Sequence, residues 1–186
     1  MSATLSTMIP LGSLAPTFSL FDTVSDKKRS LQDLKSDKAT VIFFICNHCP
    51  FVVHINKELV KLANDYMPKG ISFIAISSND VENYPADAPS EMSKIAEKER
   101  YPFPYLYDET QETAKAYKAV CTPDFFVFDN DLKCRYRGQL DNSRPSNGLP
   151  VTGKDIRNAL DCLLEQKAVS ENQLPSIGCN IKWKTT

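Results

Sequence analysis

Residues 40–51 read TVIFFICNHCPF, and this stretch decides the fold that we expect. It begins with an unbroken run of apolar, β-prone residues and then changes at once to two cysteines three positions apart, followed by proline. A run that is apolar throughout is typical of a central strand covered on both faces. Pro50 suits the first turn of a helix, where the N–H that it lacks would have no partner. The stretch therefore predicts a buried strand at 40–45, a cysteine loop and a helix.

The residues that follow predict a strand, helix and strand unit. Apolar side chains recur at helical spacing from Val52 to Tyr66, and Lys69-Gly70 ends this helix. A second apolar run at 71–77 predicts a neighbouring central strand, so the sheet should be at least partly parallel. We also expect a helix after 85–89, a short strand at 103–107 and a hairpin of 124–131 with 132–138. Two further helices should begin with capping boxes. One begins at Asp108 with Gln111 as the partner, and the other begins at Thr152 with Asp155 as the partner.

This order of elements predicts an α/β fold, with helices on both faces of a mixed sheet. Alternation places Leu132, Cys134 and Tyr136 on one face of the hairpin, and the tail from 170 to 186 has no clear periodicity. At 186 residues, of which 42% are hydrophobic, the chain fits one domain over 1–186, with a core of about 10–168 and a C-terminal tail of 169–186.

Charge and composition exclude several classes of protein. The formal net charge is −1 and the basic residues are scattered, so we expect neither a nucleic-acid partner nor a membrane surface. The N-terminus lacks the basic start and apolar core of a signal peptide, and no run is long enough to span a bilayer. We therefore expect a cytoplasmic protein. Its six cysteines then argue for catalysis or metal binding rather than for a disulfide scaffold.

The cysteine pair favours redox chemistry. With the strand ending at Ile45, we place Cys46 at the N-cap of the helix, where free N–H groups and the helix dipole favour a thiolate. We expect Cys46 to attack a disulfide and Cys49 to resolve the mixed disulfide that results. His48 lies between them and should stabilise the thiolate, which tunes the reduction potential.

Two plainer interpretations of the pair are ordinary core thiols and half of a zinc site. A structural zinc site needs four ligands, and the sequence has no second CxxC or closely spaced Cys/His pair to complete it. We therefore favour redox chemistry, with no metal and with no cofactor other than the redox-active disulfide itself.

Three segments together resemble the thioredoxin superfamily: APTFSL at 15–20, the strand followed by CNHCP, and CTPDFFVFD at 121–129. Within it the chain resembles the redoxin branch, which contains the TlpA-like thiol-disulfide oxidoreductases and the AhpC/TSA peroxiredoxins. CNHCP, NDVENYPAD, RGQLDNSRP and PSIGCNIKWK are similar to segments of a small group of soluble proteins described as thioredoxin-like or as thiol-disulfide isomerases. The resemblance covers roughly residues 10–165 and implies a thioredoxin-like three-layer fold with an N-terminal strand extension.

The resemblance also implies roles for two residues far from the pair. Pro123 matches the cis-proline that faces the cysteines, and Thr122 and Pro123 would line a groove for a substrate peptide. Thr40 stands where thioredoxin has a buried carboxylate, and Val52 stands where TlpA-like proteins often carry an acid. The proton acceptor for the second thiol must then be water, His48 or an acid that the sequence does not identify.

Two activities remain open alternatives to a thiol-disulfide oxidoreductase. An antioxidant peroxidase of peroxiredoxin type would use Cys49, because Cys46 stands where peroxiredoxins have the threonine of their Thr-x-x-Cys pattern. A copper chaperone resembling the Sco-type carriers would need a distant histidine, and the chain has only His48 and His54. The expected partners are a disulfide-containing protein or small thiol and a thiol reductase or oxidant, and the sequence makes no prediction of the oligomeric state.

Four cysteines lie outside the pair. We expect Cys121 to be a small buried residue at the end of a helix, with an auxiliary redox thiol as the alternative. We expect Cys179 to belong to a packed tail, with a third redox thiol as the alternative if the tail folds over the site. We expect packing roles for Cys134 and Cys162, and solvated side chains for His54 and Arg137.

Overall fold

The structure, a computed structural model, describes residues 3–185. Its strands are β1 (Ala3–Leu5), β2 (Ser19–Asp22), β3 (Lys27–Ser30), β4 (Ala39–Phe44), β5 (Ile71–Ser77), β6 (Tyr105–Tyr107), β7 (Cys121–Thr122), β8 (Asp124–Asp129), β9 (Cys134–Gly138) and β10 (Ile177–Asn180). Its helices are α1 (Leu31–Leu34), α2 (Pro50–Tyr66), α3 (Pro89–Glu99), α4 (Glu112–Ala116) and α5 (Lys154–Leu164), with the 3-10 helices η1 (Met67–Lys69) and η2 (Pro85–Asp87). Within the described range, every helix is too short or too polar to span a lipid bilayer.

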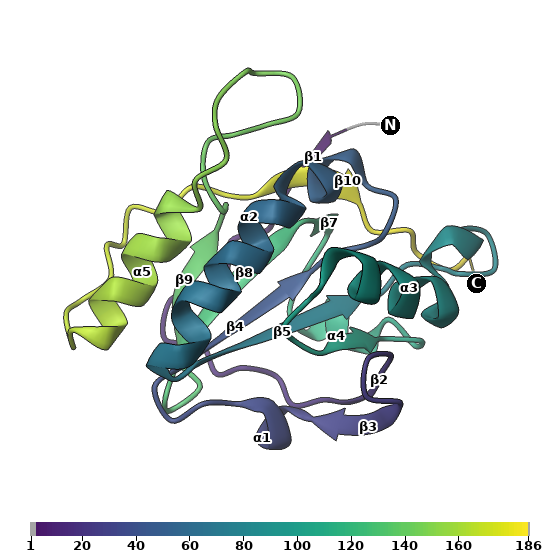
Figure 1. Cartoon of the computed structure of the whole chain (residues 1–186). Helices are drawn as coiled ribbons and strands as arrows, with labels where there is room; N and C mark the ends of the chain where they lie inside the picture. Colours follow the sequence, from purple (N-terminus) through teal and green to yellow (C-terminus); the bar gives the residue numbers. More distant parts are fainter. Residues whose placement is uncertain (1–2, 186) are drawn as a thin grey trace.

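A mixed β-sheet runs through the middle of the molecule (Figure 1). In the described chain its seven strands lie in the order β3-β2-β6-β5-β4-β8-β9. The two apolar runs of the sequence form β4 and β5, which pair in parallel, while β8 and β9 form an antiparallel hairpin. The expected α/β class and the partly parallel sheet are confirmed. Because β4 and β5 are parallel neighbours, the loops that follow them leave the same edge of the sheet, which is where α/β proteins build their sites.

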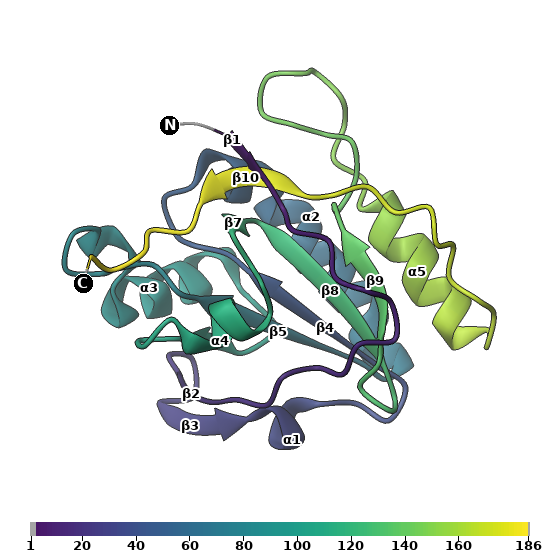
Figure 2. The same ribbon diagram turned by 180° about the vertical axis from the view of Figure 1, so that it is seen from behind.

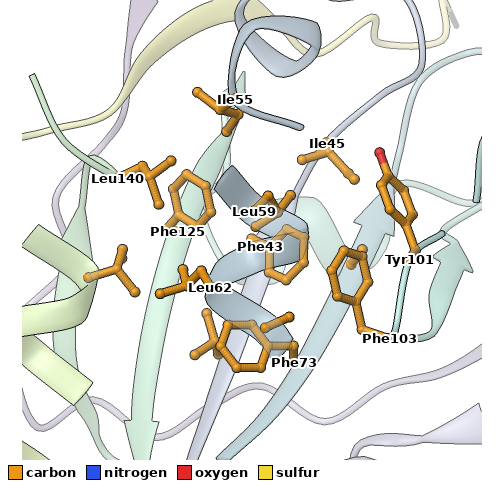
Figure 3. Packing of buried hydrophobic residues seen from close by; sticks show 14 of the residues in the cluster. Phe43, Ile45, Ile55, Leu59, Leu62, Phe73, Tyr101, Phe103, Phe125 and Leu140 are labelled. Carbon is orange, nitrogen blue, oxygen red and sulfur yellow. The ribbon is translucent and has the colours of Figure 1, made fainter. Parts of the chain in front are cut away.

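Side chains of β4 alternate between two buried clusters, one on each face of the sheet. Phe43 belongs to the cluster covered by α2, α3 and α5, whereas Phe44 belongs to the cluster covered by α1 and α4. Figure 3 shows the first cluster, in which the Phe43 ring contacts Phe103 edge-on and stacks on Phe125. Helices therefore cover both faces of the sheet, as the sequence predicted.

The C-terminal tail forms a strand that the sequence analysis missed. β10 lies between β1 and β7 in a small antiparallel sheet, seen from behind in Figure 2. Its sequence, IGCN, is too short to show a periodicity. β10 also contacts α2, which begins at the cysteine loop, so the tail lies next to the site.

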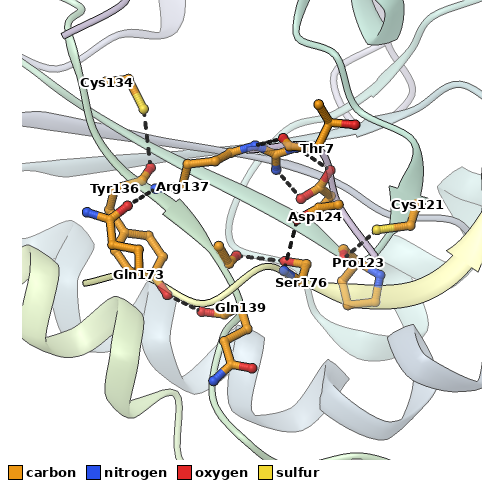
Figure 4. A network of polar contacts seen from close by, with 12 residues as sticks. Thr7, Cys121, Pro123, Asp124, Cys134, Tyr136, Arg137, Gln139, Gln173 and Ser176 are labelled. Carbon is orange, nitrogen blue, oxygen red and sulfur yellow. Dashed lines mark hydrogen bonds and ion pairs between the residues drawn. The ribbon is translucent and has the colours of Figure 1, made fainter. Parts of the chain in front are cut away.

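A buried ion pair connects β8 to the N-terminal segment and to the C-terminal tail (Figure 4). Arg137 is fully buried, contrary to the expectation of a solvated charge, and its guanidinium binds both carboxylate oxygens of Asp124. The guanidinium also donates to the Thr7 carbonyl (2.8 Å), and the Arg137 N–H donates to Gln173 (2.8 Å). These oxygens replace the water that burial removes. The network thus joins the N-terminal segment and the tail to the strand that follows Pro123.

Two helices begin later than the sequence predicted, and at each one a carboxylate from outside the helix binds N–H groups of the first turn or of the residues just before it. The helix expected from Asp108 is α4, whose N-cap is Gln111, and Asp108 accepts N–H groups of its first turn. The helix expected from Thr152 is α5, and Asp141 accepts the Thr152 N–H (2.6 Å). Neither helix has the expected capping box, and Asp155 lies within the first turn of α5.

A register shift separates side chains that the sequence analysis placed together. The ladder between β8 and β9 is irregular between Val127 and Phe128. Cys134 therefore packs in the cluster covered by α1 and α4, while Tyr136 packs in the cluster on the other face. The prediction that Leu132 and Cys134 share a face is confirmed, but the placement of Tyr136 with them is wrong, because strict alternation fails at such an irregularity.

Candidate active site

The cysteine pair lies in a short loop between β4 and α2. β4 ends at Phe44, and α2 begins at Pro50, so proline occupies the first helical position as expected. The N-cap is Cys49, not Cys46 as the sequence analysis predicted. The chain uses residues 46–48 to turn from the sheet to the helix, so Cys49 is the cysteine at the positive end of the helix dipole.

Thr122 lies against both sulfur atoms. Its hydroxyl oxygen is 3.4 Å from Cys46 Sγ, and its carbonyl oxygen is 3.3 Å from Cys49 Sγ. The Thr122–Pro123 peptide bond is cis. The hydroxyl can donate to a thiolate at Cys46, whereas the carbonyl can only accept a proton from Cys49. Thr122 therefore fits an arrangement in which Cys46 carries the charge and Cys49 carries the proton.

The other contacts of the pair favour the opposite arrangement. The pKa of Cys49 is lowered to about 5, first by the hydrogen bond that it accepts from the Cys46 thiol and then, against the effect of burial, by the Cys179 thiol and two N–H groups. The pKa of Cys46 is raised well above its usual value, first because its proton is held by Cys49 and then by burial and the Asp87 carboxylate. When the pair loses one proton, the lowered pKa of Cys49 and the raised pKa of Cys46 therefore favour the negative charge on Cys49 rather than on Cys46.

A buried carboxylate that the sequence analysis missed lies beside Cys46. Asp87, at the end of η2, is fully buried and accepts the Asn47 N–H (2.7 Å) and Asn79 Nδ2 (2.7 Å). His48 Nδ1 lies 2.8 Å from Asp87 without hydrogen-bond geometry, so the contact is a charge pair that forms when the imidazole is protonated. His48 is thus placed to neutralise the charge that opposes ionisation of Cys46. The signal that could have found Asp87 is the parallel pairing of β4 and β5, whose following loops share an edge.

Among the other cysteines of residues 3–185, Cys179 is the one that contacts the pair. It is 5% exposed, and its pKa is raised to about 12, first by burial and then by the hydrogen bond that it donates to the pair. Cys121 lies in β7 rather than at the end of a helix, and its thiol faces a backbone carbonyl 3.8 Å away. Burial raises the pKa of Cys121 as well. Cys134 lies in β9 and Cys162 in α5, both outside the loop.

Three donor groups lie close enough together to hold a metal ion. A sulfur of Cys46, a ring nitrogen of His48 and a carboxylate oxygen of Asp87 lie within 4.8 Å of one another. Zinc accepts such a mixed set of ligands, whereas copper(I) selects sulfur. His54 does not join the set, because its Nε2 contacts the Ser143 hydroxyl (2.7 Å) on another part of the surface. The geometry therefore lacks the distant histidine that the copper alternative required.

Close relatives share both the sequence and the fold of the chain. Residues 11–137 match the profile of the AhpC/TSA family. The chain is similar to an uncharacterized conserved protein from Geobacillus kaustophilus, with 65% identity, a TM-score of 0.99, and coverage of 100% of this chain and 98% of that chain. It is also similar to a hypothetical protein from Sinorhizobium meliloti, with 44% identity, a TM-score of 0.96, and coverage of 98% of this chain and 100% of that chain.

A more distant likeness concerns the fold alone. A thioredoxin family thiol:disulfide interchange protein from Chlorobium tepidum has 17% identity, a TM-score of 0.63, and coverage of 84% of this chain and 99% of that chain. No curated protein matches the sequence. The family match runs from the segment before β2 into β9 and includes the whole cysteine loop. The chain therefore belongs to the AhpC/TSA family, in the redoxin branch of the thioredoxin superfamily.

Proposed function

We propose that the protein is a thiol-disulfide oxidoreductase that cycles Cys46 and Cys49 between a dithiol and a disulfide. The observation that carries this proposal is the placement of two buried cysteine sulfurs against the same residue, Thr122, with the pKa of Cys49 lowered to about 5. At neutral pH the loop therefore holds one nucleophile and one further thiol that can resolve a mixed disulfide. Membership of the AhpC/TSA family supports redox chemistry at this loop.

Cys46 is the attacking sulfur in this mechanism. Both cysteines are buried, but Cys46 lies in the loop before the helix whereas Cys49 is the N-cap of α2, so we assign the attack to Cys46. The Cys46 proton passes to Cys49 along their hydrogen bond. Thr122 then binds both products, because its hydroxyl donates to the Cys46 thiolate and its carbonyl accepts the Cys49 proton. Cys49 is thus the base that activates Cys46.

The second step needs no external base. When Cys46 attacks, one sulfur of the substrate stays bound to Cys46 and the other leaves as a thiolate. The leaving thiolate takes the proton from Cys49, whose sulfur then attacks Cys46 Sγ. The Cys46–Cys49 bond forms, the bond to the substrate breaks, and the second half of the substrate leaves as a thiolate that takes its proton from solvent.

The surrounding residues set the potential and the binding of the substrate. When it is protonated, His48 neutralises Asp87 and so stabilises the charged form of the dithiol, which makes the disulfide more oxidising. We assign the binding of a disulfide-containing protein or a small disulfide to the edge of β7 at Thr122 and Pro123, which are buried under β10 in this structure. The disulfide itself is the redox group, and a cellular thiol reductase or oxidant returns the pair to its starting state.

Equilibration in glutathione buffers, followed by alkylation and mass mapping, tests the proposal. We expect a Cys46–Cys49 disulfide; a potential of about −270 mV would indicate a reductase, and one of about −180 to −120 mV an isomerase or oxidant. Cys49→Ser should trap oxidised glutathione on Cys46, and Cys162→Ser, distant from the loop, is the matched control. If no Cys46–Cys49 disulfide forms while Cys162→Ser and wild type remain folded, the proposal fails.

A peroxidase is a second candidate, which the position of Cys49 favours. Cys49 caps α2, precedes Pro50 and has the lowered pKa that a peroxide-reactive thiol needs. The test is the rate at which hydrogen peroxide converts Cys49 to a sulfenic acid in Cys46→Ser/Cys179→Ser, which removes both neighbouring thiols. A rate no greater than that of free cysteine would eliminate this candidate.

A further inference from the structure

The backbone of β10 lies directly on the peptide bond that precedes Pro123. β10 pairs antiparallel with β7, and Cys179 is opposite Thr122 (Figure 2). A Cβ atom added at Gly178 would stand 1.9 Å from the Thr122 carbonyl oxygen and 3.1 Å from Pro123 N. No other residue at position 178 would let the strand approach so closely. The tail therefore occupies the edge of β7 beside the cysteine loop.

This placement brings Cys179 into contact with Cys49. The Thr122 carbonyl is 3.3 Å from Cys49 Sγ, and the residue paired with Thr122 is Cys179. Cys179 and Cys49 are buried in one cluster where β10 contacts α2, and the N–H and thiol of Cys179 lower the pKa of Cys49. Cys49 therefore contacts two thiols, those of Cys46 and Cys179, whereas Cys121 faces a backbone carbonyl instead. We propose that Cys179 is a third redox thiol, which takes over the disulfide of the Cys46–Cys49 pair by bonding to Cys49 Sγ.

The transfer is a thiol-disulfide exchange within one chain, and it rests on the proposed function because the oxidised pair is its substrate. Cys179 loses its proton and its sulfur attacks Cys49 Sγ. The Cys49–Cys179 bond forms, the Cys46–Cys49 bond breaks, and Cys46 leaves as a thiolate that takes up the proton. The number of disulfides is unchanged, so no external oxidant or reductant takes part. The exchange restores the Cys46 thiol and ties the tail covalently to the start of α2.

Oxidation of the pair prepares Cys179 for this attack. In the reduced protein, burial raises the pKa of Cys179 most, and the hydrogen bond to Cys49 and the charge on Cys49 raise it further. Once Cys49 is part of a disulfide, it carries no charge and no longer holds the proton of Cys179. The two causes that depend on Cys49 then disappear, while Lys182 continues to favour the thiolate. Cys179 is therefore easier to ionise after oxidation than before it.

Hydrogen bonds on both sides of β10 hold Cys179 in place. Before the strand, Ser176 N donates to the Ser6 hydroxyl (2.9 Å), and Ser6 N donates to the Ser176 carbonyl (2.9 Å). After it, Lys182 N donates to Asn79 Oδ1 (2.9 Å), and the Lys182 carbonyl accepts from Gln111 Nε2 (2.8 Å). A nucleophile fixed in this way reacts as if it were highly concentrated.

Oxidation of a chain that lacks Cys46 tests the proposal. All proteins carry Cys162→Ser, and the probe is oxidised glutathione, followed by mass mapping without reduction. In Cys46→Ser, we expect glutathione to be displaced from Cys49 and a Cys49–Cys179 disulfide to form. In Cys46→Ser/Cys179→Ser, glutathione should remain on Cys49.

The parent with Cys46 intact separates the two proposals. Glutathione that stays on Cys49 in Cys46→Ser, while the parent forms its Cys46–Cys49 disulfide, overturns the role of Cys179 and leaves the proposed function standing. A parent in which Cys49 forms a disulfide neither with Cys46 nor with Cys179 overturns both, because there is then no disulfide to transfer.

Gly178→Ala tests whether the reaction depends on the position of Cys179, because it moves β10 without removing a thiol. The added Cβ meets backbone rather than a flexible side chain, so β10 must move away from β7. In the Cys46→Ser background, displacement of glutathione from Cys49 should slow on the order of 100-fold, as expected when a reacting group is misplaced by about 1 Å. Gly178→Ala alone should still form the Cys46–Cys49 disulfide, which shows that the loop is folded. Equal rates with Gly and Ala at position 178 would contradict the proposal.

Discussion

Alanine in place of Cys46 should raise the pKa of Cys49, whereas serine should leave it low. In the wild type, the hydrogen bond from the Cys46 thiol is the largest cause that lowers the pKa of Cys49 from 9.0 to about 5. A serine hydroxyl can donate in place of the thiol, but the methyl group of alanine cannot. The donors from Cys179 and Val52 remain in both variants, but burial opposes them, so the pKa of Cys49 should be higher in Cys46→Ala than in Cys46→Ser.

The same titration controls the stability of the reduced protein. Because folding lowers the pKa of Cys49 from 9.0 to about 5, the unfolded chain binds one proton more than the folded chain between these pH values. The free energy of unfolding should therefore rise with pH across this window, by at most about 1.4 kcal/mol per pH unit from this group. The contribution is lost as the pH falls towards 5. Above pH 9.0 the slope should reverse, because Cys46 and Cys179 keep protons in the folded state that they lose in the unfolded state.

Two measurements on the reduced proteins test whether the Cys46 thiol lowers the pKa of Cys49. The ultraviolet absorbance of the thiolate is followed against pH in wild type, Cys46→Ser and Cys46→Ala, with Cys49→Ser as the blank. Urea unfolding of wild type and Cys49→Ser at several pH values isolates the contribution of this thiol to stability. A wild-type midpoint near 9.0, or equal midpoints in the serine and alanine variants, would refute the shared proton.

Three further perturbations address the surroundings of the pair. Asp87→Asn removes a charge that raises the pKa of Cys46, so the disulfide should become more oxidising, on the order of 30 mV for each pKa unit. His48→Ala removes the side chain that can compensate Asp87, so it should shift the reduction potential in the opposite direction. Glutathione equilibria measure both shifts, and shifts of the same sign would contradict the argument. Thr122→Val removes the hydroxyl that donates to Cys46. In the Cys49→Ser background, glutathione should therefore become bound to Cys46 more slowly. In the chain that keeps both cysteines, Thr122→Val should leave the pKa of Cys49 unchanged. Arg137→Met leaves Asp124 buried without a partner and should lower the free energy of unfolding in urea by about 3–5 kcal/mol, which a second change, Asp124→Leu, should largely restore.

The centre of the fold could be predicted because its signal is local. Every residue of β4 is buried, so the strand appears in the sequence as an apolar run without alternation. Pro50 and Gly70 bound the following helical segment for conformational reasons that need no knowledge of the rest of the chain. These elements alone place two cysteines at a strand-to-helix junction.

The rest could not be predicted because it depends on contacts between segments far apart in the sequence. Asp108 binds N–H groups in the first turn of α4, and Asp141 binds those of the two residues before α5, so a search for capping boxes fails at both helices. Asp87 is identifiable as a site residue only once the loop after β5 is known to lie beside the loop after β4. β10 has no apolar pattern of its own, since its position comes from its two neighbours, β1 and β7. The N-cap at Cys49 depends in turn on how the loop turns, which the spacing of the cysteines does not specify.

One side chain connects the charge beside Cys46 to the strand that carries Cys179. Asn79 Nδ2 donates to Asp87 (2.7 Å), and Asn79 Oδ1 accepts from Lys182 N (2.9 Å). Both ends of the amide are in use, so the group cannot turn over without losing both bonds. A displacement of β10 that admits a substrate beside Thr122, and that carries Lys182 with it, would free Asn79 and remove one of the bonds that hold Asp87. Entry of a substrate at the edge of β7 and the electrostatic environment of the attacking thiol are therefore linked through the end of β5.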